Sequence, residues 1–191
     1  MDEEQVISAL RGQDPAAARE LVDSYGQRLL RSAFLLCGNE TEAQDLVQET
    51  FLQAWKSAHR FRGGAALYTW LHAILLNLTR HYHRDRKRLV SDPNLTEEEI
   101  PAPEEGPSRL DTDAASTALT DALGRLTAPH REVVVLRFYE DMKICQIAAH
   151  LGISKGTVKS RLHYAIAQLR DLLPGELNLF GVPGTKETEN R

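Results

Sequence analysis

The stretch KICQIAAHLGISKGTVKSRLHYAIAQLR, from Lys143 to Arg170, decides the fold of the second half of the chain. Apolar residues recur at three- or four-residue intervals on both sides of Gly152, which predicts two short helices joined by a tight turn. Ser154 is a good N-cap for the second helix. Ala148 is small enough to let the helices approach closely, and Ile153 fills the corner. This layout predicts a DNA-binding helix-turn-helix, whose second helix enters the major groove.

The outward face of the second predicted helix carries basic and hydroxyl side chains in its N-terminal half. They are Ser154, Lys155, Thr157, Lys159, Ser160 and Arg161. Arg and Lys contact guanine edges or phosphates, Ser and Thr do either more weakly, and a helix N-terminus itself attracts phosphate. An ordinary helical hairpin with a solvated basic face is the alternative. The small residue, the turn glycine and the capped helix occur together at the right offsets, which favours DNA binding.

The net charge of −4 over 191 residues is unevenly distributed. Residues 1–90 carry +1 and residues 114–173 carry +3, whereas residues 91–113 carry −7 and residues 174–191 carry −1. Prolines and mutually repelling carboxylates in residues 91–113 predict a flexible acidic linker. We therefore expect an all-α chain of two small helical domains, residues 1–90 and 114–173, joined by that linker and followed by a tail, with the helix-turn-helix in the second domain.

The sequence lacks the signals of a disulfide-rich, membrane-spanning or metal-binding protein. Cys37 and Cys145 are too few for a disulfide framework, and we expect Cys145 to be a small, half-buried thiol. No signal peptide and no apolar run of membrane-spanning length is present, which predicts a cytoplasmic protein without membrane insertion. His81 and His83 lack a cysteine pair or a third ligand. We expect no metal, no cofactor and no enzymatic activity.

Local signals place the helices of the N-terminal domain. A short helix should end near Gly12, and Asp14 should cap a second helix that ends near Gly38. Thr41 with Gln44 forms a capping box for a third helix. In the C-terminal domain, Pro129 should start a single helix over residues 130–139 that leads into the helix-turn-helix.

A long helix is predicted from about Ala66 to Arg88, after a glycine-bearing loop. Its last turns, from Arg80 to Arg88, hold five basic residues against one acid, with aromatic and histidine rings between them. Cations are favoured at a helix C-terminus, so a merely solvated basic end is one explanation. The interleaved rings favour a surface that follows a nucleic-acid backbone while bases stack nearby.

Four motifs resemble a known family. DLVQETFLQAW over residues 45–55, followed by FRG at residues 61–63 and YTWL at residues 68–71, is similar to the first conserved domain of bacterial extracytoplasmic-function sigma factors. GISKGTVKSRL over residues 152–162 looks like their second domain. The order of the domains around a variable linker also matches, so the resemblance covers nearly the whole chain.

The resemblance implies roles for particular residues and partners. For docking on the clamp helices of the RNA polymerase core, the implied residues are Asp45, Gln48, Glu49 and Gln53. For opening the minus-ten promoter element and holding a flipped base, they are Phe61, Arg62, Gly63, Tyr68, Trp70, Asn77, Arg80 and Arg84. The six residues of the second helix, beginning at Ser154, correspond to the contacts with the minus-thirty-five element.

The family comparison also defines what the sequence leaves open. Gly64 and Leu67 stand where an acidic residue and an aromatic residue are common, which leaves the identity of the captured base open. We expect the regulon to serve a stress or envelope response, but the sequence does not specify its genes. An anti-sigma factor is a further expected partner, and the sequence does not identify it. A freestanding helix-turn-helix repressor or activator is the alternative function. Its N-terminal helices would sense a ligand or dimerise, using the face of residues 45–55.

Overall fold

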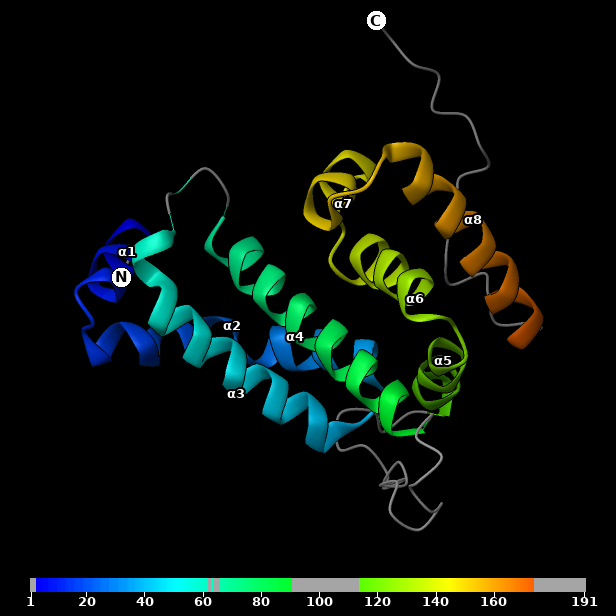
Figure 1. Ribbon diagram of the computed structural model, residues 1–191, viewed down its shortest axis with the longest axis horizontal. Helices are drawn as coiled ribbons and strands as arrows, with labels where there is room; N and C mark the ends of the chain where they lie inside the picture. The colour runs from blue at the N-terminus through cyan, green and yellow to red at the C-terminus, as the bar shows by residue number, and fades with distance from the viewer. Residues whose placement is uncertain (1–2, 62, 64–65, 91–113, 174–191) are drawn as a thin grey trace, which may run out of the picture.

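The computed structural model describes residues 3–61, 63, 66–90 and 114–173, and this part of the chain is helical without a strand (Figure 1). The all-α prediction is confirmed. The predicted linker 91–113 and tail 174–191 lie outside the described residues. The elements are α1 (Glu3–Arg11), α2 (Pro15–Cys37), α3 (Glu40–Ser57), the short 3-10 helix η1 (Ala58–Arg60), α4 (Leu67–Val90), α5 (Ala114–Gly124), α6 (Ala128–Val134), the π-helix η2 (Val135–Tyr139), α7 (Ile144–Leu151) and α8 (Lys155–Leu172).

The ends of α2 agree with the sequence, but the start of α3 does not. The side chain of Asp14 accepts a hydrogen bond from the Ala16 amide, and Gly38 ends α2 in the left-handed conformation at φ 76°. Asn39, not Thr41, caps α3, because its side chain accepts from the Glu42 amide at 2.9 Å. Both residue types are good caps. The left-handed turn at Gly38 brings the chain into α3 two residues earlier than the predicted capping box.

The helix-turn-helix is confirmed. α7 ends at Gly152, which adopts φ 66°, and the Ile153 amide donates to the Ala148 oxygen at 3.0 Å across the turn. Ser154 caps α8 by accepting from the Thr157 amide at 3.0 Å. The left-handed conformation disfavours a side chain at position 152, which explains the glycine.

The prediction of a single helix over residues 130–139 is wrong in one respect. α6 begins at Ala128, and from Val135 the backbone widens into the π-helix η2. The Glu140 amide donates to the Val135 oxygen, five residues earlier, at 3.0 Å. Hydrophobic periodicity shows that a segment is helical, but a π-turn accommodates one extra residue that leaves no simple mark in the sequence.

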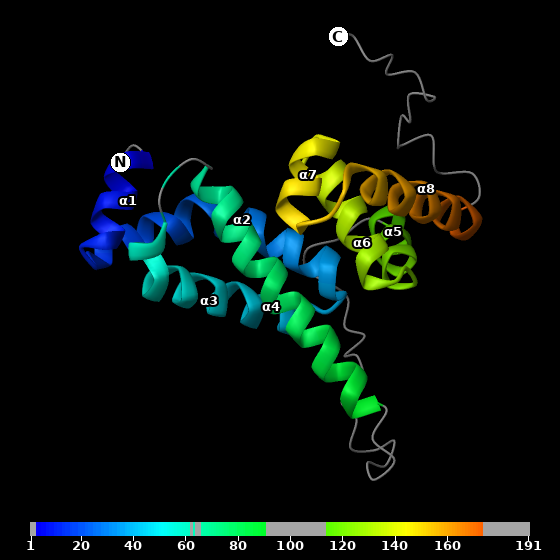
Figure 2. The ribbon, with the colours of Figure 1, turned by 45° about the horizontal axis from the view of Figure 1, so that its top comes forward.

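The helices form two cores that contact each other. α1–α4 enclose one core and α5–α8 the other, and the C-terminal helices pack against α2 and α4 (Figures 1 and 2). Leu36 of α2 and Leu76 of α4 are buried in the second core, although both belong to the N-terminal helices. The two predicted domains therefore share an apolar contact in addition to the polar contacts described below.

Candidate partner and nucleic-acid interfaces

The four residues predicted to dock on polymerase lie on one face of α3. Asp45 and Gln48 are exposed, whereas Glu49 and Gln53 are half-buried. Gln53 Nε2 donates a hydrogen bond to Glu49 Oε1 at 3.2 Å. The spacing of three and four residues is the reason that the side chains share a face.

An apolar groove of about 740 Å³ lies beside this polar face, between α2 and α3. Val22 is 48% exposed and Leu52 is 52% exposed, and both line it. Gln48 belongs to the groove and to the polar face at once. The groove was not predictable from the sequence, because apolar residues at helical spacing predict a packed core. The lining residues are Ala18, Leu21, Val22, Gly26, Leu30, Gln44, Val47, Gln48, Phe51, Leu52 and Trp55.

The residues predicted to contact the minus-ten element occupy different environments. Phe61 is buried and packs against Trp70, with ring centroids 5.0 Å apart. Asn77 and Arg84 are exposed on α4, and Gly63 is exposed with φ 76°. Arg62 lies outside the described residues.

Tyr68 and Arg80, also predicted for the minus-ten element, instead face the C-terminal helices. Tyr68 is 8% exposed, and its hydroxyl donates to Glu140 Oε1 at 2.7 Å. Burial, followed by the nearby Glu140 carboxylate, raises the pKa of Tyr68. Arg80 donates from Nε and Nη2 to the two oxygens of Glu132, each at 2.8 Å. In this arrangement both side chains are engaged within the protein.

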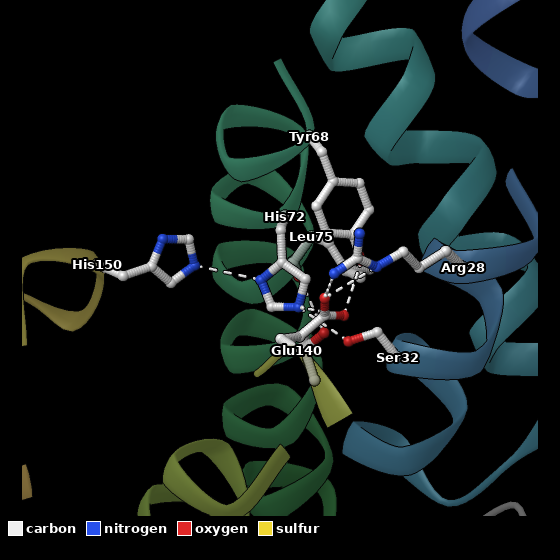
Figure 3. A network of polar contacts seen from close by, with 8 residues as sticks. Arg28, Ser32, Tyr68, His72, Leu75, Glu140 and His150 are labelled. Carbon is white, nitrogen blue, oxygen red and sulfur yellow. Dashed lines mark hydrogen bonds and ion pairs between the residues drawn. The ribbon is translucent and has the colours of Figure 1, made fainter. Parts of the chain in front are cut away.

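Glu140 is the centre of a polar network between the two groups of helices (Figure 3). Its side chain is fully buried, and Oε2 accepts from Arg28 Nε at 3.1 Å and from Arg28 Nη2 at 2.7 Å. The Arg28 guanidinium also lies 4.0 Å from the centroid of the Tyr68 ring, in cation–π geometry. We call Arg28, Tyr68 and Glu140 the Glu140 network.

Two histidines extend this network toward α7. His72 Nε2 lies 2.8 Å from Ser32 Oγ, and His72 Nδ1 lies 3.2 Å from His150 Nε2 (Figure 3). Burial, and then the neighbouring His150 and Arg28, lowers the pKa of His72 to about 3. Burial and Arg80 also lower the pKa of His150. Neutral imidazoles suit this contact, because one ring donates and the other accepts.

The network was not predicted from the sequence, although the sequence contains one signal of it. Tyr68 and His72 lie four residues apart along α4, next to the apolar stripe. Both are buried. Polar residues in such positions indicate a buried partner, but they do not identify it.

The outward face of α8 is open, as predicted. Lys155, Lys159 and Ser160 are exposed, while Thr157 and Arg161 are half-buried at the edge of the helix. Cys145 on α7 is exposed, so the expectation of a half-buried thiol is wrong. The reason is its position on the solvent side of α7, opposite the buried Ile147.

Among the described residues, His, Cys, Asp and Glu side chains do not gather in groups of three or more that would hold a metal ion. Within the same residues, every helix is too short or too polar to cross a bilayer.

Comparison with known proteins gave consistent results for both parts of the chain. Residues 21–89 match the family model Sigma-70 region 2, and residues 122–171 match Sigma-70, region 4. The ECF RNA polymerase sigma factor SigL of Mycobacterium tuberculosis is 35% identical over 168 residues, which cover 86% of this chain and 93% of that protein.

Two solved structures are similar in fold and sequence. The sigma factor RpoE of Bartonella quintana, in complex with the anti-sigma factor NepR, has a TM-score of 0.68 and 29% identity, covering 83% of this chain and 96% of that one. CnrH, in complex with the cytosolic domain of CnrY, has a TM-score of 0.66 and 25% identity, covering 91% of this chain and 98% of that one.

Proposed function

The chain belongs to the extracytoplasmic-function sigma factors of RNA polymerase, and we propose that it binds the polymerase core and directs it to a set of promoters. It would act as a specificity subunit in the cytoplasm and catalyse no reaction itself. The observation that carries the proposal is the presence, in one chain, of an open helix-turn-helix face and an open partner groove on a separate group of helices.

We assign core docking to α3 and the groove beside it. Asp45 and Gln48 are exposed, and the neighbouring Leu52 presents apolar surface that the fold itself does not cover. A protein interface typically combines an apolar centre with a polar rim, and this part of α3 and α2 has both. The groove therefore adds an apolar centre to the polar residues suggested by the sequence.

Two surfaces are assigned to promoter DNA. The N-terminal half of α8 would contact the minus-thirty-five element through the exposed Lys155, Lys159 and Ser160 and the half-buried Thr157 and Arg161. The Phe61–Trp70 ring pair and the exposed Asn77 and Arg84 would serve the minus-ten element. In this proposal the half-buried Trp70, held by the buried Phe61, offers the ring on which an unpaired base stacks, and Arg84 contacts the backbone further along α4.

An anti-sigma factor is a further proposed partner. Support comes from the similar sigma factor of Bartonella quintana, which was solved in complex with the anti-sigma factor NepR.

Charge reversal on α3 tests the docking assignment. Asp45→Lys with Glu49→Lys should abolish co-purification with core polymerase while leaving the helical circular dichroism spectrum unchanged. Asp121→Lys with Asp171→Lys, two exposed carboxylates of α5 and α8, is the matched control. Unaltered association of the α3 variant would refute the docking assignment. Promoter-specific DNA binding by the wild-type chain without core polymerase would favour a freestanding regulator instead.

A further inference from the structure

We propose that Glu3 and Arg11 of α1 are positioning residues, which hold the main chain at Leu67 and Phe61 and thereby set the Trp70 ring for an unpaired base of the minus-ten element. The inference rests on the proposed function, because it concerns how the surface assigned to that element is held in place. It adds α1, which carries none of the residues assigned to polymerase or DNA, to the parts of the chain on which promoter recognition depends.

The first argument is the face of α1 on which the two side chains lie. Glu3, Ile7 and Arg11 follow one another at four-residue spacing, which places them on one side of the helix. Val6 and Leu10, on the neighbouring side, are 5% and 2% exposed and belong to the N-terminal core. α1 lies beside η1 (Figures 1 and 2). The apolar residues already attach the helix, so the polar pair contributes direction to the contact.

The second argument is the missing local cap of α4. The residue before α4 is Ala66, which has no side-chain acceptor, whereas α2, α3 and α8 each follow a residue whose side chain accepts from the first turn. Glu3 Oε1 accepts a hydrogen bond from the Leu67 amide at 2.7 Å, across 64 positions. This amide is one of the donors that an α-helix leaves unpaired at its N-terminus, where a carboxylate is also favoured by the helix dipole. Glu3 therefore supplies from α1 the cap that α4 lacks.

The third argument is the matching contact on the other side of the glycine-bearing loop. Arg11 Nη2 donates a hydrogen bond to the main-chain oxygen of Phe61, and the Phe61 amide donates to the Ala58 oxygen at 3.1 Å. Arg11 and Glu3 lie eight residues apart, which is about 12 Å along α1. One short helix thus binds a carbonyl where the chain leaves η1 and an amide where it enters α4.

The two anchored positions carry the ring pair assigned to the minus-ten element. Phe61 is anchored itself, and Trp70 follows Leu67 by three residues, within the first turn of α4. The centroids of the two rings are 5.0 Å apart. A shift at the start of α4 would move the Trp70 ring relative to Phe61. A site binds more tightly and more selectively when its contact residues are held in place before the ligand arrives.

The test variant is Glu3→Ala with Arg11→Met, which removes both anchors and keeps the buried face of α1. Glu4→Ala with Arg19→Met is the matched control, because it removes the same charges from exposed side chains of α1 and α2. Glu3→Gln with Arg11→Lys is the conservative variant, which keeps an acceptor and a donor. Exchange of the Leu67 amide hydrogen, measured by nuclear magnetic resonance on each free chain, reports the cap independently of function.

Promoter selection gives the functional measurement. Holoenzyme assembled from core polymerase and each variant selects templates from a duplex library randomised in both the minus-ten and the minus-thirty-five element. We expect the test variant to exchange the Leu67 amide about tenfold faster and to lose about tenfold in enrichment of the preferred minus-ten bases. Its minus-thirty-five preference should stay unchanged, because α8 is untouched. The control should match the wild type, and the conservative variant should keep most of the minus-ten preference.

The other outcomes would overturn the proposal in distinguishable ways. Unchanged exchange of the Leu67 amide in the test variant would exclude Glu3 as the cap of α4. Faster exchange with an unchanged minus-ten preference would overturn the positioning role. Equal loss of preference at both elements would indicate a general loss of structure and would overturn that role too. If the wild type enriches no sequence at either element, the proposed function fails and the positioning role with it, while amide exchange still decides whether Glu3 caps α4.

Discussion

Arg131 donates a hydrogen bond from Nη1 to the main-chain oxygen of Leu36 at 2.7 Å, although the two residues are 95 positions apart in the sequence. The same guanidinium donates to the oxygens of Leu123 and Gly124, each at 2.8 Å, and to that of Leu126 at 3.2 Å. These carbonyls lie at the ends of α2 and α5, where helical partners are missing. One buried cation therefore satisfies chain ends from both groups of helices, and burial lowers its pKa.

Replacement of Arg131 should be among the most destabilising single changes in the chain. Arg131→Met leaves several buried carbonyl groups without donors, and we expect a loss of about 3 kcal/mol in the free energy of unfolding. Arg131→Lys should recover only part of it, because an ammonium lacks the planar set of donors. Urea denaturation measures both, with the exposed Arg125→Met as the control. A change of less than about 0.5 kcal/mol in Arg131→Met would contradict the assignment.

Acid should weaken the contact between the two groups of helices through His72. The groups that face it are Arg28 and Ser32 from α2, Tyr68 from α4, Glu140 at the end of η2, and His150 from α7. Glu140 alone would favour a charged imidazole, but Arg28 and Tyr68 already bind that carboxylate. Burial therefore dominates, and the pKa of His72 falls from 6.5 to about 3.

The sign of the pH effect follows from this depressed pKa. In the unfolded chain, His72 takes up a proton as the pH falls below about 6.5, whereas in the folded protein it stays neutral. The contribution of His72 to the free energy of unfolding is therefore fully present above pH 6.5 and declines toward pH 3, by about 2 kcal/mol between pH 8 and pH 5. Thermal denaturation across this range should show the decline, and His72→Gln should reduce it. An identical pH profile in the variant would exclude His72 as the cause.

Two side chains of α8 should differ in how they affect promoter choice. Lys159 is exposed and suited to phosphate, so Lys159→Ala should weaken all promoter variants alike and reduce the salt dependence by about one counterion. If Arg161 is bidentate to one base, Arg161→Ala should weaken promoter binding by about 1–3 kcal/mol, and only at promoters that carry that base. Transcription from single-position variants of the upstream element measures both. If Arg161→Ala lowers transcription from all the promoter variants by the same factor, Arg161 contacts a phosphate and not a base.

The groove between α2 and α3 offers a separate test of partner binding. Leu52 is 52% exposed, so Leu52→Asp should change the free energy of unfolding by no more than about 0.5 kcal/mol. Burial of an unpaired carboxylate against a partner should nevertheless weaken binding to core polymerase by about tenfold or more. Ala167→Asp, an exposed position on α8, controls for the added charge. Undiminished binding by Leu52→Asp would remove the groove from the interface.

The features that were predictable from the sequence have local causes. Asp14, Gly38, Gly152 and Ser154 act on backbone groups within a few residues, so their roles follow from spacing alone. The choice of Asn39 over Thr41 as the cap of α3 shows the limit of such signals. Two acceptable caps stand two residues apart, and the conformation of the preceding turn selects between them.

The contact between the two groups of helices was beyond the sequence analysis for a physical reason. Glu140 meets Arg28 across 112 positions and Tyr68 across 72, and no periodicity links such distant residues. Composition indicated an acidic linker between basic surfaces, but it did not indicate that carboxylates within the C-terminal helices would bind those surfaces. The residue roles assigned to the polymerase and to each promoter element stay predictions.

The π-helix before Glu140 has a consequence for comparing relatives of this protein. Each residue of an α-helix turns the chain by about 100°, whereas a π-turn spreads one extra residue over a single wider turn. A relative that lacks one residue of Val135–Tyr139 would therefore form a regular α-helix here, and a glutamate at its end would still point toward α2 and α4. A one-residue gap in an alignment at this turn thus does not indicate that the contact is lost, because the wider turn absorbs the extra residue.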